Sequence, residues 1–205
     1  MVGSTGVPLR GDGMSMWRFV GICLVVAAVL SVPGCRRQAE PLPVLGSVPE
    51  FRLTDEQGQP ITRDDLRGKV WVADFIFTQC AGPCPRMSRR MSELQGVVAG
   101  GGVVLVSFSV DPTRDTPAVL REYGRIYNAR PGLWRFVTGD EVTIHQLCRD
   151  GFKLSVEPAK AAEPISHSTY FNLVDREGRI RGVFDGDDPQ AFKRLKDAIQ
   201  RLLVE

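Results

Sequence analysis

The stretch KVWVADFIFTQCAGPCPRMSRRM, residues 69–91, joins an apolar run, two cysteines and a polar segment with helical periodicity. Residues 69–77 are apolar at almost every position, which predicts a strand buried within a sheet. Pro85 suits the first turn of a helix, where its missing N–H costs little. Four residues then recur at the spacing of a buried helix face: Met87, Met91, Leu94 and Val98. The stretch predicts a strand with Cys80 at its carboxyl end and a helix that Cys84 opens.

The rest of the chain alternates in the same way. We expect further strands at 102–110 and 133–139, and helices at 116–127, 140–149 and 188–205. Thr116, Asp140 and Asp188 are the expected helix N-caps. Hairpins are expected over 48–62, with its turn at Asp55–Gly58, and over 166–186. This pattern predicts an α/β fold with a central mixed sheet flanked by helices and an N-terminal hairpin.

The first 35 residues have the composition of a leader. Residues 17–32 are apolar, too short for a typical spanning helix of ~20 residues but suited to an export signal. The run ends in SVPGC, which resembles a bacterial lipoprotein signal and makes Cys35 the candidate lipidation site. An uncleaved membrane anchor is the alternative, and Arg36 and Arg37 on its exported side disfavour it. We expect a leader over 1–35, a flexible tether over 36–47 and one domain over 48–205.

Charge and cysteine content exclude two classes of protein. The net charge of the 205-residue chain is only +2, so no nucleic acid is expected as a partner. Of five cysteines, Cys23 lies in the leader and Cys35 precedes the tether, which leaves Cys80, Cys84 and Cys148. A small domain held together by disulfides would need more cysteines in pairs.

The Cys80–Cys84 pair is compatible with a structural disulfide, a redox couple or a metal site. Four residues of helix advance ~6 Å, so the two thiols can share either a disulfide or an ion. A disulfide over so short a loop would stabilise the fold little. Thiol oxidoreductases usually have C-x-x-C, so the wider C-x-x-x-C favours metal, and thiolates suit Cu(I), Zn(II) or an iron–sulfur centre. The helix N-terminus should lower the thiol pKa, most of all for Cys84.

A mononuclear ion would need a further ligand. His167 precedes an expected strand and is a candidate. His145 lies within an expected helix and is expected to be a surface or core-edge histidine. Cys148 is expected to be a buried thiol. Asp111 ends the second long strand, where it is expected to cap a turn, to orient the site or to dock a partner.

Three segments together carry a family resemblance: FIFTQCAGPCPRM, VSFSVDPTRDTPAVLREYG and SHSTYFNLVDREGRIRG. They closely resemble the SCO/SenC proteins over about residues 48–204. The resemblance implies a thioredoxin-like domain that binds one copper ion through two cysteines and a histidine. Carried over by motif, these ligands are Cys80, Cys84 and His167.

The resemblance also implies a function. The chain is expected to be a membrane-tethered copper chaperone, not an enzyme, that helps assemble the dinuclear copper centre of cytochrome c oxidase. Its expected partners are the copper-centre subunit of the oxidase, a copper donor protein and the membrane. Its expected location is the periplasmic face of the bacterial cytoplasmic membrane. One alternative is a thiol–disulfide reductase that keeps the oxidase cysteines reduced, with Cys80 and Cys84 as its redox pair. A peroxidase of the same fold is less favoured, because it needs an activated cysteine with partner residues that the sequence does not identify.

Overall fold

The strand β4 (Val70–Ile76) lies within an eight-stranded sheet and is buried at every position. It pairs in parallel with β5 (Val103–Ser109) and antiparallel with β7 (Tyr170–Val174). The strand order is β1-β8-β7-β4-β5-β6-β2-β3, and β6 (Trp134–Thr138) pairs in parallel with β5. The expected mixed sheet and its central apolar strand are confirmed.

The structure, a computed structural model, describes residues 1, 3, 6, 40–154 and 169–205. Pro41–Glu205 form one compact unit, which holds all the helices and strands described here. Cys35 and His167 lie outside the described residues. Among the helices within the described ranges, none has the length and apolar character needed to cross a membrane.

Two hairpins extend the sheet on both sides. β2 (Arg52–Asp55) and β3 (Pro60–Thr62) form the expected N-terminal hairpin, and β2 also pairs with β6. The Asp55 carboxylate accepts hydrogen bonds from the backbone N–H groups of Gln57 and Gln59, both at 2.8 Å, and thereby closes the turn. On the other side, β7 pairs with β8 (Arg179–Asp185).

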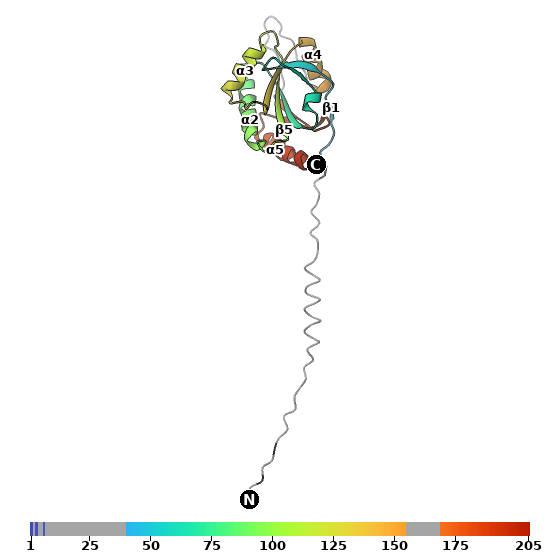
Figure 1. Cartoon of the computed structure of the whole chain (residues 1–205), viewed down its shortest axis with the longest axis vertical. Coiled ribbons are helices and arrows are strands. Elements are labelled where there is room, and N and C mark those ends of the chain that lie inside the picture. The colour runs from blue at the N-terminus through green and yellow to red at the C-terminus, as the bar shows by residue number, and fades with distance from the viewer. Residues whose placement is uncertain (2, 4–5, 7–39, 155–168) are drawn as a thin grey trace. The chain divides into compact units, whose positions relative to one another are not determined.

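Three helices cover one face of the sheet: α2 (Cys84–Val97), α3 (Pro117–Ile126) and α5 (Pro189–Val204). Tyr123 of α3 packs edge-on against Phe136, and Phe192 of α5 lies 5.9 Å from Phe171, measured between ring centroids. A hydrogen bond of 2.8 Å between the Ser88 and Tyr123 hydroxyls joins α2 to α3. Figure 1 shows these helices on the side of the strands opposite to α4.

The opposite face is covered by α4 (Glu141–Gln146) and η2 (Leu147–Gly151), a π-helix. Phe152 follows η2 and packs against Trp71 and Phe75 of β4. The single helix expected over 140–149 therefore divides into an α-helical and a π-helical part. The N-caps Thr116, Asp140 and Asp188 are confirmed, because each side chain accepts a hydrogen bond from a first-turn N–H group.

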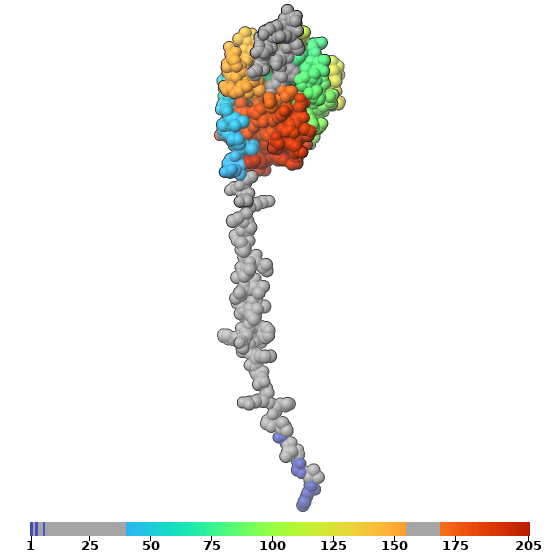
Figure 2. Space-filling view, turned by 180° about the vertical axis from the view of Figure 1, so that it is seen from behind, coloured from blue at the N-terminus to red at the C-terminus, as the bar shows by residue number. Residues whose placement is uncertain are grey.

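The folded unit begins before the expected boundary at residue 48. β1 (Gly46–Ser47) pairs with the start of β8, and the Leu45 N–H group donates to the Ile180 carbonyl at 2.8 Å. The buried Arg181 side chain donates to the Leu42 carbonyl at 2.6 Å. Figure 2 shows this N-terminal part of the unit beside the C-terminal elements. Residues 42–47 thus belong to the domain, because backbone pairing and a buried guanidinium fix them.

Arg181 also connects the two ends of this unit. Its guanidinium pairs with Asp175 at 2.9 Å and with Glu205 at 3.0 Å, and it donates to the Leu42 and Pro43 carbonyls. Burial by itself would raise the pKa of Asp175, but hydrogen bonds from Arg179 and Arg181 hold that pKa below its usual value. Asp175 therefore stays ionised and keeps the buried cation paired.

Replacing Arg181 with methionine should destabilise the protein by about 3 kcal/mol, because it leaves a buried carboxylate with fewer partners. Urea unfolding measures this loss, and proteolysis should cut more readily before residue 48. The matched control Arg179→Met, at a partly exposed partner of the same carboxylate, should cost much less. A loss below about 1 kcal/mol for Arg181→Met would show that the Arg181 contacts contribute little to the stability of the fold.

Candidate metal centre

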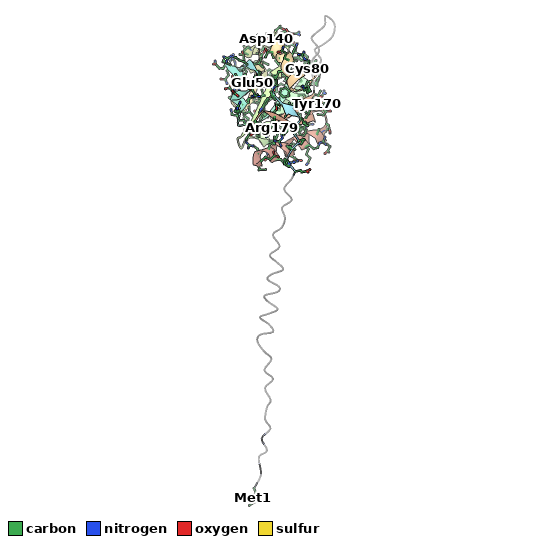
Figure 3. All side chains as sticks on the ribbon, turned by 90° about the vertical axis from the view of Figure 1, so that its right-hand side faces the viewer. Met1, Glu50, Cys80, Asp140, Tyr170 and Arg179 are labelled. Carbon is green, nitrogen blue, oxygen red and sulfur yellow. The ribbon has the colours of Figure 1, made fainter. Side chains whose placement is uncertain are left out.

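Cys80 and Cys84 flank the short segment between β4 and α2, as expected. Cys80 is half-buried, whereas Cys84 is the first residue of α2 and is 0% exposed. The Cys80 N–H group donates to the Phe77 carbonyl, and the N–H groups of Arg86 and Met87 donate to the Pro83 carbonyl, which starts the helix. Figure 3 shows Cys80 toward the end of the unit where Asp140 lies and Arg179 toward the other. The pair thus offers one accessible and one enclosed thiol.

The environment of Cys84 contradicts one expectation. Burial raises the pKa of this thiol well above its ordinary value, and a backbone hydrogen bond from Phe77 offsets only part of that rise. A hydrogen bond with Cys80 and the charges of Cys80 and Asp74 raise the pKa further. The expected lowering by the helix N-terminus was wrong, because desolvation of the thiolate outweighs the helix dipole here. Cys84 therefore keeps its proton until a metal ion or another reactant removes it.

Asp74 is a buried carboxyl group beneath this site. It lies in β4, is 0% exposed and accepts a hydrogen bond of 2.6 Å from the Ser107 hydroxyl. Ser107 in turn accepts a hydrogen bond of 2.9 Å from the Trp134 indole N–H group. The other oxygen, Oδ2, has no hydrogen-bond partner, and burial raises the pKa of Asp74 to about 7. The sequence analysis missed Asp74, although an acid within an otherwise apolar strand was a visible signal.

Asp115 fixes the segment that leads to Cys80. Its buried carboxylate accepts hydrogen bonds from the Thr78 hydroxyl at 2.5 Å and the Thr78 N–H group at 3.1 Å. It also accepts one from the Ser109 hydroxyl at 2.5 Å. Asp115 thus joins the ends of β4 and β5 below the cysteine segment. The sequence analysis missed this residue and considered its neighbour Asp111 instead.

Asp111 caps a turn, which was one of its expected roles. Its carboxylate accepts hydrogen bonds from the Thr113 hydroxyl at 2.9 Å and from Arg114 Nε at 2.6 Å. Its carbonyl oxygen accepts from the N–H groups of Arg114 and Asp115. These bonds hold Asp111 within its own turn and place Asp115 at Thr78.

The other candidates lie in the core or on other elements. Met87 and Met91 are fully buried, as expected. Cys148 is also buried, and burial raises the pKa of its thiol to about 12. His145 lies half-buried on α4. Within residues 40–154 and 169–205, no three Cys, His, Asp or Glu side chains form a group that could hold a metal ion.

Thr169, the first described residue after position 154, lies beside the first turn of α2. Thr169 follows His167 by two positions, and its carbonyl oxygen accepts a hydrogen bond of 2.9 Å from the Gly186 N–H group. Gly186 packs so closely on Met87 that a Cβ atom there would overlap the Met87 sulfur. Met87 lies three residues after Cys84, so Thr169 is held close to the cysteine-bearing turn.

This geometry has a counterpart in known proteins. The SCO1/SenC family model matches residues 43–203. The chain belongs to the SCO1/SenC family. The matched region includes the strand–cysteine–helix unit and both hairpins. It begins at Pro43, whose carbonyl accepts a hydrogen bond from Arg181.

Three solved structures support the SCO1/SenC assignment. A SCO1/SenC family lipoprotein from Bacillus anthracis is 31% identical, with a TM-score of 0.71 over 77% of this chain and 95% of that one. BsSco, a Sco protein of cytochrome c oxidase assembly studied for a disulfide switch, is 27% identical, with a TM-score of 0.70 over 81% and 100%. Copper-bound ScoI from Bradyrhizobium japonicum is 26% identical, with a TM-score of 0.62 over 74% and 99%. These likenesses confirm the expected thioredoxin-like fold.

Asp74 should make stability depend on pH. The folded protein keeps this proton up to about pH 7, whereas an unfolded aspartate releases it near pH ~4. The stability that protonation provides is therefore complete below about pH 4 and is lost as the pH rises through about 7. Asp74→Asn cannot ionise and should be more stable than the parent at pH 8 by roughly 2 kcal/mol.

Urea unfolding at several pH values between 4 and 8, under reducing conditions, measures this difference. The two proteins should converge at the acidic end. Asp197→Asn, at an exposed acid of α5, should keep the pH dependence of the parent. If the stability of Asp74→Asn depended on pH as strongly as that of the parent, the raised pKa of Asp74 would be contradicted.

Proposed function

We propose that this protein binds one copper ion through Cys80, Cys84 and His167 and delivers it to the dinuclear copper centre of cytochrome c oxidase. In this role it is a metallochaperone and copper is its cargo. Its partners are the copper-centre subunit of the oxidase and a protein that donates copper.

The arrangement of the two thiols carries the proposal. The two thiols are hydrogen-bonding neighbours at the start of α2, and charge on Cys80 raises the pKa of Cys84. Two sulfur ligands suit Cu(I), and an added imidazole suits both copper oxidation states. The partial positive charge of the helix N-terminus favours the anionic thiolate pair. His167 lies two positions before Thr169, which is held beside the same turn.

The difference in exposure suits delivery. Copper displaces the proton of the enclosed Cys84, so binding depends on pH and on reduced thiols. Cys80 is the more accessible ligand and offers a receiving protein its point of attack. Three ligands leave room for an incoming ligand, whereas a closed four-ligand site would hold the ion more firmly.

Two relatives support a role in copper binding and oxidase assembly. ScoI of B. japonicum binds copper, and BsSco belongs to a family of cytochrome c oxidase assembly proteins. Their likeness to this chain covers most of both chains in each case.

A thiol–disulfide reductase is the second candidate. One observation favours it: Cys80 is accessible and lies within hydrogen-bonding reach of Cys84, as an attacking and a resolving thiol would. The raised pKa of Cys84 weighs against fast exchange, because the thiolate is the reactive form. The two functions are compatible, since copper binding also requires reduced thiols.

Copper titration of the reduced domain, residues 40–205, tests the ligands. The parent should bind one ion, and its Cu(II) form should show sulfur-to-copper charge-transfer absorption. Cys80→Ser and Cys84→Ser should each lose that band, and Cys148→Ser should retain it. His167→Ala should lose Cu(II) yet keep a reducible Cys80–Cys84 pair. If His167→Ala fully restores oxidase in cells at limiting copper while holding no metal, the reductase becomes the better explanation.

We also propose that the domain is held at the periplasmic face of the cytoplasmic membrane, by lipid on Cys35 or by an uncleaved anchor. The B. anthracis relative is a lipoprotein, and SVPGC provides the matching cysteine. Mass spectrometry of the membrane-extracted protein should show an acylated N-terminus at Cys35. A mature chain that still contains Trp17 would instead favour the anchor, and Cys35→Ala would then leave the protein on the membrane.

A further inference from the structure

The turn between β8 and α5 is bonded to the cysteine-bearing turn of α2. Arg86 Nε and Nη2 donate to the two carboxylate oxygens of Asp187, both at 3.0 Å. The pair joins positions 101 residues apart in the sequence. By contrast, the ion pairs Arg90–Glu93 and Lys193–Asp197 each lie within one helix. A bidentate pair fixes orientation as well as distance, so it holds two separate elements in one arrangement.

Two further contacts lie beside this ion pair. Gly186 packs against the Met87 sulfur, and its N–H group donates to the Thr169 carbonyl. A larger residue at Gly186 would overlap both Met87 and Thr169. The start of β7, the β8–α5 turn and the first turn of α2 therefore form one packed junction.

The β8–α5 turn positions Asp187, and Arg86 keeps its carboxylate ionised. The Asp185 carboxylate accepts a hydrogen bond of 2.9 Å from the Asp187 N–H group, which shapes the turn. The bond from Arg86 holds the pKa of Asp187 below its usual range, so the carboxylate stays charged. Asp187 is thus charged, and able to pair with Arg86, at neutral and mildly acidic pH.

Arg86 and Met87 occupy the same helical turn as Cys84, so motion of the junction moves this thiol. We infer that the Arg86–Asp187 pair is a positioning clamp: it keeps Cys84 enclosed and thereby slows the loss of copper from the site. The second part of this inference rests on the proposed function, whereas the first part concerns the protein without metal. Neither residue is assigned as a ligand.

The first test uses the metal-free, reduced protein. Arg86→Gln and Asp187→Asn should each speed the alkylation of Cys84 by iodoacetamide about fivefold, because the buried thiol reacts only when the junction opens. The double variant should be no faster than either single variant, since the clamp is already broken. Asp197→Asn is the matched control on α5 and should leave the rate unchanged.

Cys148 is an internal reference within the same experiment. It is buried on the other face of the sheet, so its alkylation should stay slow if only the junction opens. Peptide mass spectrometry follows both cysteines in one sample. Unchanged Cys84 alkylation in the single variants, additive rates in the double variant, or equal acceleration of Cys148 would each overturn the clamp.

The second test measures copper transfer to a chelator. Each single variant should release copper about fivefold faster than the parent, and the exchanged pair Arg86→Asp with Asp187→Arg should recover most of the slow rate. Release at the parent rate from both single variants would overturn the effect on copper. If the parent binds no copper, the proposed function fails, and the alkylation experiment still decides whether the clamp exists.

Discussion

The burial of β4 on both faces is the constraint on which the site depends. A strand enclosed by β5, β7 and helices on both faces has one register, so its carboxyl end is fixed to within a residue. Cys80 follows that end, and Asp115 holds the intervening Thr78 by two hydrogen bonds. The position of the thiols thus comes from core packing, and the segment that carries them needs little rigidity of its own.

Desolvation acts on two acidic groups of this site in the same direction. It raises the pKa of both Asp74 and Cys84. A charge on Asp74 would raise the pKa of Cys84 further, so below about pH 7 both of these groups keep their protons. A cation that binds two thiolates removes this restraint for Cys84, because it supplies the missing positive charge. The apolar surroundings therefore favour the protonated forms of Asp74 and Cys84 unless a cation lies close to them.

Much of this fold could be predicted from the sequence because its signals are local. The apolar run of β4, the N-caps and the turn at Asp55 each depend on neighbouring residues. Contacts between distant residues were not predictable. Only the tertiary fold creates the hydrogen bonds of Arg181 with Leu42, of Asp115 with Thr78 and of Arg86 with Asp187. The Cys80–Cys84 pair was found because its spacing is local, whereas the pKa of Cys84 was misjudged because burial is a property of the whole domain.

The contacts of Arg181 with Asp175, Glu205 and the segment at Leu42 also determine how the domain bears mechanical load. β7 runs antiparallel to β4, so the β7–β8 turn and the end of α5 lie at the end of the sheet opposite to Cys80. Tension on the chain at Pro41 passes into Arg181, the β1–β8 bonds and Glu205. That path does not include β4 or α2. Pulling on the N-terminal side would therefore strain the edge of the sheet first and leave the thiol pair undistorted until β1 separates.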